Sequence, residues 1–273
     1  MVTPFRNPWQ PRLIRRVVDT KQTGTEVVEV VTNDGPGFIK FLGNPEGPHV
    51  LAAEFVGTRL AGEMGLAILD WEVFPYDGIP EIRLPSGNLA QAGSAWSTRK
   101  VEGFVWSGNP DDLTVISNPS DIAKLVLFDQ WVLNCDRYRP EPRLRQNLHN
   151  VFFSREDSES GKFRLLAMDH THIFTCGGEF RPDMARLEKV RDPLAYGLFP
   201  GFVRFIRYED AVAALAAMAV VDEVAIRTIV RDVPMDWQVS PEVREAMIDF
   251  LLQRRNWLVT NFVTSIFPQG ELF

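Results

Sequence analysis

Short apolar runs separated by turn-forming residues occupy the first third of the chain, and this pattern predicts β-strands. The runs VVEVV (27–31) and GFIKFL (37–42) are rich in β-branched and aromatic residues, and the segment TNDGP between them is typical of a turn. We therefore expect an antiparallel hairpin here. Two further strand-like runs follow, LDWEVF (69–74) and FVW (104–106), with the small-residue segment AQAGSAWS (90–97) between them.

Helical spacing replaces this pattern in several places. Residues 49–64 contain no proline and lead to Gly65, which is suited to a left-handed helix cap. A second helix is expected over 120–133, with Ser120 as its N-cap. The last hundred residues are typical of helices again, most clearly over 241–263, which begins with a serine cap and a proline at the first helical position.

Two short apolar runs, VFF (151–153) and FRLLAM (163–168), flank a charged connector and predict a second hairpin. The element order is therefore a small antiparallel sheet with one helix, followed by a larger and mainly helical part. This is an α+β arrangement of two lobes. We expect the smaller lobe to span residues 1–104 and the larger lobe residues 105–273, together forming one functional domain.

Composition limits the class of protein. The chain has 273 residues, 45% of them hydrophobic and 24% charged, so it can bury a core of its own. Its net charge of −7 argues against a nucleic-acid partner. The most membrane-like run, 211–221, is much shorter than the span of about 20 apolar residues that a membrane requires, so we expect a buried helix there and no membrane partner. Two cysteines, Cys135 and Cys176, are too few for a disulfide framework and, with no secretion signal, predict a reduced cytoplasmic protein.

Lys40 stands among apolar residues in the strand 37–42, where neither strand face is cleanly polar. Desolvating an unpaired ammonium costs several kcal/mol, so this side chain either reaches solvent or meets a counter-charge. Glu54, on the helix that follows, projects from a face of small and apolar residues and is a natural partner. The alternative, in which both side chains reach solvent, stays open at this point.

Three polar residues of the second half are expected to converge. Asn150 directly precedes the first strand of the second hairpin and Asp169 directly follows the second strand, so antiparallel pairing brings them to the same end. Asp136, in the loop that leads into this hairpin, can approach the same end. Carboxylate and amide oxygens suit magnesium, and a further carboxylate can orient a hydroxyl. Each residue alone is more typical of a turn, so the inference depends on their combination.

The order of a strand lysine, a helix glutamate, and then Asp, Asn and Asp parallels the set of residues that protein kinases use. The sequence also resembles the HipA-like kinases, whose fold is related to protein kinases and phosphatidylinositol kinases. The resembling segments are spread over most of the chain in the family's order: 38–66, 127–137, 150–153, 165–174 and 232–258.

The resemblance implies roles for these residues. Lys40 would contact the phosphates of ATP and Glu54 would orient it, while Asp136 would accept the proton of the substrate hydroxyl. Asn150 and Asp169 would bind Mg²⁺. The family phosphorylates serine or threonine, and some members are toxins of bacterial toxin–antitoxin systems, so an antitoxin-like partner is one expectation. The acceptor, a protein or a small molecule, is not specified by the sequence.

The chain departs from the family pattern in its catalytic loop. Asp136 and Arg137 are followed by Tyr138 instead of histidine, and about ten additional residues precede Asn150, which makes Asn147 a rival metal ligand. The region before Lys40 that should cover the phosphates has one glycine, Gly24, and the metal-binding aspartate lies in MDHTHIF (168–174) instead of Asp-Phe-Gly.

Other residues are expected to support this site. Asp129 lies on the apolar face of the helix 120–133 and is expected to accept hydrogen bonds from loop backbone or from Arg137. His170 is expected beside the metal-binding aspartate. Arg137, Arg139, Arg143 and Arg145 form either a basic rim for a phosphate or acidic substrate, or a solvated loop.

Two alternative functions remain open from the sequence. In the first, a kinase-fold enzyme acts on a lipid or small-molecule acceptor, or transfers AMP. In the second, a pseudokinase serves as a binding module without catalysis, which the missing glycine-rich loop and the altered Asp-Arg-His motif favour.

Overall fold

The computed structural model describes residues 9–156 and 161–267, which divide into two compact units. Unit 1 comprises the chain up to Leu51 together with Leu69–Lys100 and Asp236–Gln238, and unit 2 comprises Ala52–Ile68, Val101–Met235 and the chain from Val239. Residues 52–68 thus belong with unit 2. The expected division at residue 104 into two lobes stays a prediction.

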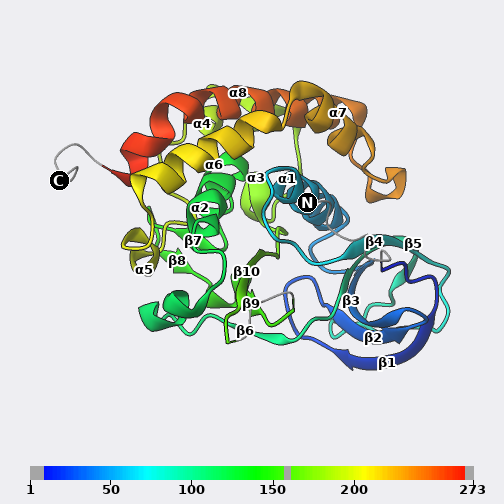
Figure 1. Ribbon diagram of the computed structural model, residues 1–273. Coiled ribbons are helices and arrows are strands. Elements are labelled where there is room, and N and C mark those ends of the chain that lie inside the picture. The colour runs from blue at the N-terminus through cyan, green and yellow to red at the C-terminus, as the bar shows by residue number, and fades with distance from the viewer. Residues whose placement is uncertain (1–8, 157–160, 268–273) are drawn as a thin grey trace. The chain divides into compact units, whose positions relative to one another are not determined.

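Unit 1 contains an antiparallel sheet with the strand order β1-β2-β3-β5-β4 (Figure 1). Its strands are β1 (Ile14–Thr20), β2 (Val28–Thr32), β3 (Gly35–Leu42), β4 (Trp71–Tyr76) and β5 (Gln91–Arg99). The β2–β3 hairpin is confirmed, with Val30 opposite Gly37 and Thr32 opposite Gly35. Val28, Val30, Ile39 and Phe41 are fully buried in the core beneath this sheet, as β-branched and aromatic side chains on a pleated face should be.

The sequence pattern predicts neither β1 nor β5 of this sheet, and β5 is the more unusual of the two. Apart from Trp96, its residues QAGSAWSTR are small or polar, and most of them have low strand propensity. It nevertheless pairs with β3 on one side and with β4 on the other, so its backbone groups are satisfied along both edges. Position in the sheet therefore outweighs intrinsic propensity here.

A short segment from late in the chain completes unit 1. The carboxylate of Asp236 accepts a hydrogen bond of 2.6 Å from the backbone N–H of Ser94, and the indole of Trp237 donates one of 2.8 Å to the Ser94 carbonyl. The His49 ring lies 3.3 Å from the Gln238 carbonyl. Asp236 and Trp237 are thus attached to Ser94 of β5, and Gln238 lies beside His49 at the start of α1.

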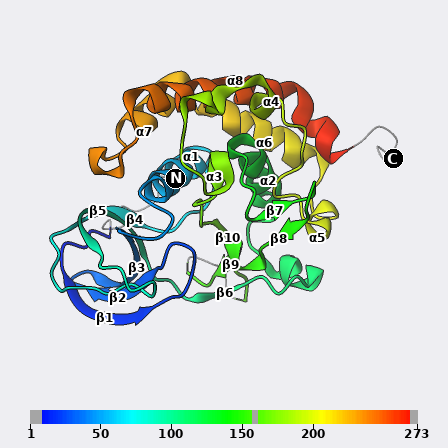
Figure 2. The same cartoon turned by 180° about the vertical axis from the view of Figure 1, so that it is seen from behind.

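Unit 2 is mainly helical. Its longer helices are α1 (His49–Glu63, in unit 2 from Ala52), α2 (Asp121–Val132), α6 (Tyr208–Val220), α7 (Glu223–Arg231) and α8 (Pro241–Ile266). Shorter helical turns are α3 (Ile173–Cys176), α4 (Leu187–Val190), α5 (Pro200–Val203), η1 (Pro110–Val115), η2 (Leu148–Asn150) and η3 (Pro182–Ala185). The turn η4 (Met235–Trp237) begins in unit 2 and continues into unit 1. Helix α2 packs against α6 and α8, and α8 runs beside α6 (Figure 2).

The predicted helix starts have different outcomes. At α8, the Ser240 hydroxyl accepts a hydrogen bond from the N–H of Val243, as expected of an N-cap. At α2, the prediction of a Ser120 side-chain cap is wrong, because Ser120 already has helical dihedrals and makes no such bond. The apolar run 211–221 is also less buried than expected: α6 buries Ala211, Ala214 and Met218 but exposes its opposite face.

The strands of unit 2 include β9 (Val151–Ser154) and β10 (Arg164–Ala167), which form the predicted second hairpin, and β6 (Gly103–Val105) on the other side of β9. The residues inserted before Asn150 fold back as a small antiparallel pair, β7 (Tyr138–Arg139) and β8 (Arg145–Gln146).

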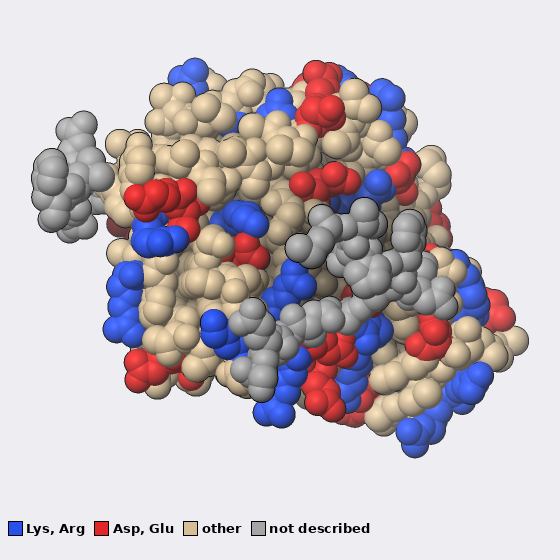
Figure 3. All heavy atoms as spheres, viewed as in Figure 1, with Lys and Arg blue, Asp and Glu red and all other residues tan. Residues whose placement is uncertain are grey.

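Charged side chains of both signs are intermixed on the face of the molecule drawn in Figure 3. Across the part of the chain that the structure describes, no helix combines the length and the apolar character needed to cross a membrane.

Helix α1 approaches the segment after β10 closely because it has a glycine at position 57. A Cβ at this position would stand 2.5 Å from the Cβ of His170, which is fully buried. The ring of His170 also contacts Phe128 of α2, with ring centroids 5.1 Å apart. Gly57 is thus required for packing, although glycine disfavours a helix interior.

We predict that Gly57→Ala lowers the free energy of unfolding by about 1 to 2 kcal/mol, because overpacking at a fully buried neighbour outweighs the helix propensity that alanine adds. Urea denaturation measures this. Gly62→Ala is the matched control in the same helix, since its Cβ would meet the flexible end of Ile68 at 3.0 Å. The control should be neutral or stabilising, and equal losses at both positions would contradict the packing argument.

Candidate functional site

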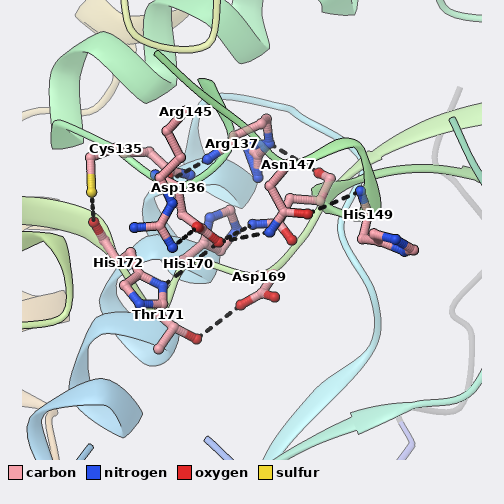
Figure 4. Close-up of polar contacts among 12 residues, drawn as sticks. Cys135, Asp136, Arg137, Arg145, Asn147, His149, Asp169, His170, Thr171 and His172 are labelled. Carbon is pink, nitrogen blue, oxygen red and sulfur yellow. Dashed lines mark hydrogen bonds and ion pairs between the residues drawn. The ribbon is translucent and has the colours of Figure 1, made fainter. Parts of the chain in front are cut away.

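Asp136 is the centre of a group of polar contacts in unit 2 (Figure 4). Its side chain is buried, and its Oδ2 accepts hydrogen bonds from the amides of Asn147 at 3.0 Å and Asn150 at 2.8 Å. Its Oδ1 contacts the guanidinium of Arg145, and the Nδ1 of His172 lies 3.7 Å from Oδ2. The structure therefore brings Asp136 together with both candidate asparagines.

The two asparagines differ in their surroundings. Asn147 caps the turn η2, and its side-chain oxygen accepts a hydrogen bond of 3.2 Å from the N–H of His149. Asn150 ends the same turn and is buried. Asn147 thus uses its amide oxygen to shape the loop, which is the typical role of an asparagine at a helix start.

Arg137 is fully buried and joins three segments of unit 2. It donates from Nη1 to Asp129 Oδ1 at 2.8 Å, from Nε to the Asn150 carbonyl at 3.0 Å, and from Nη2 to the Met168 carbonyl at 2.6 Å. Of the two partners that the sequence left open for Asp129, loop backbone or Arg137, the structure has Arg137. One guanidinium therefore fixes the residue before β9 and the residue before Asp169 relative to α2.

Asp129 is buried on α2 with Arg137 and Asn134 as its partners. Burial raises the pKa of its carboxyl group from 3.8 to about 6, because the loss of hydration outweighs the charge of Arg137 and the hydrogen bond from Asn134. Gly197 lies close by, and a Cβ there would meet Asp129 Oδ2 at 2.4 Å. The Asp129 carboxylate is therefore enclosed by Arg137 and Asn134 at Oδ1 and by the backbone at Gly197 at Oδ2.

Glu54 and Asp169 meet at a single hydroxyl group. The Thr171 Oγ1 lies 2.9 Å from Glu54 Oε1 and 2.9 Å from Asp169 Oδ1, and the N–H of His170 donates to Glu54 Oε2 at 3.0 Å. A hydroxyl has one proton, so it can donate to only one of the two carboxylates at a time. The Thr171 hydroxyl therefore links the helix glutamate to the aspartate after β10.

Asp169 has a left-handed backbone conformation with φ of 56°. Such a conformation is uncommon outside glycine, although aspartate tolerates it better than most residues. It turns the chain sharply after β10 and places the Asp169 carboxylate beside Thr171 (Figure 4).

The donor set is compatible with magnesium. In the described part of the chain, no three His, Cys, Asp or Glu side chains form a metal-binding cluster. Magnesium, however, commonly takes one or two protein oxygens and completes its octahedron with water and substrate phosphates. One aspartate and one asparagine amide, as at Asp169 and Asn150, satisfy that requirement.

Lys40 lies on β3 in unit 1, opposite Trp96 of β5, with 9% of the residue exposed. Glu54 belongs to unit 2, so the pairing of Lys40 with Glu54 stays a prediction. Cys135, directly before Asp136, is disulfide-bonded, so the prediction of reduced cysteines is wrong at this position.

Comparison with known proteins bears on the fold. No protein-family model matches the sequence, and no curated protein does. The structure is similar to a proinflammatory kinase of Helicobacter pylori, CtkA, with a TM-score of 0.60 and 12% identity over 93% of this chain and 96% of the kinase. The chain has a kinase-like fold. The expected α+β class is thereby confirmed, and the likeness is consistent with the resemblance to HipA-like kinases.

Two further solved structures have lower scores. A Golgi casein kinase gives a TM-score of 0.46 and 9% identity over 97% of this chain and 74% of that one. HipA of Shewanella oneidensis, solved with HipB and its operator DNA, gives 0.47 and 12% over 92% and 67%. Of the three, the first exceeds a TM-score of 0.5, and the assignment of a kinase-like fold depends on it.

Two contacts of this kinase-like fold were not anticipated from the sequence. Thr171 links Glu54 to Asp169. The one feature of the sequence that points to this contact is the position of Thr171 two residues after Asp169. Arg145 was expected at a basic rim or in solvent, whereas it contacts Asp136. Nothing in the local sequence of the insertion indicates that second contact.

Asp129 should make a pH-dependent contribution to stability. Its pKa in the folded chain, about 6, lies above the ordinary 3.8. A raised pKa means that this contribution is complete below about pH 4 and is lost as the pH rises through about 6. We predict that the unfolding free energy of the wild type relative to Asp129→Asn falls by roughly 2 to 3 kcal/mol between pH 4 and pH 7.

The two proteins share every other titrating group, so the difference between their urea denaturation curves at each pH isolates Asp129. The prediction is contradicted if the unfolding free energy of the wild type minus that of Asp129→Asn stays constant or rises with pH. Either result would show that the pKa of Asp129 is not raised in the folded chain.

Proposed function

We propose that the chain is an ATP- and Mg²⁺-dependent phosphotransferase in which Asp136 accepts the proton of the acceptor hydroxyl. The observation that carries the proposal is the position of Asp136, a buried carboxylate held by the amides of Asn147 and Asn150. The kinase-like fold supports the same reaction class. In this reaction the hydroxyl oxygen bonds to the γ-phosphorus, the β–γ bridging oxygen leaves with ADP, and the hydroxyl proton passes to Asp136.

Asn150 and Asp169 are proposed as the magnesium ligands. Bound magnesium would neutralise the phosphate charge. Both amide nitrogens donate to Asp136, but the Asn147 oxygen also accepts the His149 N–H, so Asn150 is the preferred ligand. The Thr171 hydroxyl would hold the Asp169 carboxylate in place for this role.

Lys40 is proposed to contact the ATP phosphates and Glu54 to orient it, as the family resemblance implies. The same resemblance supports serine or threonine of a protein as the acceptor, and an antitoxin-like partner. Glu54 is held by His170 and Thr171, which would keep its carboxylate in one place.

We predict that Asp136→Asn lowers phosphoryl transfer by about 10²- to 10⁴-fold and leaves nucleotide binding nearly unchanged, because Asp136 acts on the acceptor proton. Transfer is measured with labelled ATP. Binding is measured as thermal stabilisation by Mg-ATP, where a ligand at a hundred times its Kd contributes about 2.7 kcal/mol.

Asp169→Asn is the contrasting variant, since it should remove the magnesium-dependent part of that stabilisation. Wild-type protein that gains stability from Mg-ATP but transfers no phosphate would identify a pseudokinase. Absence of stabilisation at saturating nucleotide would exclude the ATP-dependent function altogether.

The Thr171 hydroxyl should matter for the metal site, because it orients the Asp169 carboxylate. We predict that Thr171→Val weakens Mg²⁺ binding, followed as the magnesium dependence of nucleotide stabilisation, by about 10-fold. Thr175→Val is the matched control, because the Thr175 hydroxyl donates to the Gly178 carbonyl and touches neither carboxylate in the known contacts. Equal effects of both changes would contradict a specific role for Thr171.

A further inference from the structure

The strands β7 and β8 carry an arginine to the proposed catalytic aspartate. Arg145 of β8 contacts Asp136 Oδ1, while Oδ2 accepts the amides of Asn147 and Asn150. A hydroxyl that approaches Asp136 must therefore compete with Arg145 for Oδ1. With Arg145 in this position, the proposed base is engaged on both of its oxygens.

This contact is suited to opening. The Arg145 side chain is 45% exposed, whereas that of Asp136 is 7% exposed. The exposed Arg145 is readily solvated when it leaves, and Asp136 then keeps the two amide hydrogen bonds of Asn147 and Asn150. The β7–β8 pair that carries Arg145 pairs only Tyr138 with Gln146 and Arg139 with Arg145, so few backbone hydrogen bonds oppose a movement of this arginine.

The charge of Arg145 limits what can displace it. A guanidinium stays protonated at any physiological pH, so it leaves one anion most readily for another. Arg143, between β7 and β8, is exposed and adds positive charge beside it. An acceptor with a carboxylate or phosphate near its hydroxyl would attract Arg145 and free Asp136 Oδ1 in the same event.

We propose that Arg145 forms an ion pair with Asp136 in the absence of an acceptor and exchanges it for an ion pair with an anionic group beside the acceptor hydroxyl. The enzyme would thereby select acidic acceptors. Arg145 is thus a specificity residue that also restrains the base until such an acceptor binds. The inference rests on the proposed phosphotransferase function and adds to it the class of acceptor.

The resting contact can be tested without turnover, by hydrogen exchange of the backbone amides of residues 140–146 in the full chain. Arg145→Gln and Asp136→Asn should each raise exchange by about fivefold, because each removes the ion pair between these two residues. The double variant should raise exchange no further, since that same ion pair is already lost in either single variant. Arg143→Gln is the control on the same hairpin and should leave the exchange unchanged. Equal exchange in Arg145→Gln and Arg143→Gln would overturn the resting contact.

Acceptor choice is tested with two serine peptides that differ in their flanking residues, aspartate in one and alanine in the other. The wild type should give the higher kcat/KM with the aspartate peptide. Arg145→Gln should lose that preference and transfer to the alanine peptide as fast as the wild type or up to about fivefold faster. Arg143→Gln should keep a preference.

A preference for the alanine peptide, or an aspartate preference that survives in Arg145→Gln, would overturn the acidic acceptor. Slower transfer to the alanine peptide in Arg145→Gln would overturn the restraint on Asp136. If the wild type phosphorylates neither peptide while the exchange result holds, the proposed function has failed, and the acceptor selectivity fails with it.

Discussion

The buried ion pair between Asp129 and Arg137 is the interaction on which the rest of the candidate site depends. Both side chains are inaccessible to solvent, and the same guanidinium binds the carbonyls of Asn150 and Met168. Replacing such a pair by well-packed apolar residues is often neutral for stability, whereas removing one partner costs about 3 to 5 kcal/mol. Its contribution is therefore mainly positional: it sets where β9 begins and where β10 ends, and so where Asn150 and Asp169 stand.

Around this pair the site accumulates negative charge in a chain whose net charge is already −7. Glu54 and Asp169 share one hydroxyl, and Asp136 lies within the same unit. An anionic nucleotide can approach such a region only with compensating positive charge. Magnesium, Lys40 and Arg145 are the compensating charges in the proposed mechanism, each acting at a different carboxylate or phosphate.

The parts of this architecture that the sequence predicts are those in which local pattern and long-range packing agree. Branched residues place β2 and β3, and the serine and proline at its start place α8. The apolar helix face around Asp129 predicts a nearby donor for its carboxylate, with loop backbone and Arg137 as the two candidates. The strand β5 and the contact of Arg145 with Asp136 could not be predicted. The first depends on neighbouring strands, and the second on how an insertion folds back over a distant residue.

The chain visits each compact unit more than once, because residues 52–68 belong to unit 2 and residues 236–238 to unit 1. On the ribosome, the first strands of unit 1 emerge long before Asp236 and Trp237, which bind Ser94. The segment 52–68 likewise waits for residues 101–235. A nascent chain that ends before residue 238 therefore lacks part of both units, so neither can be completed until synthesis is nearly finished.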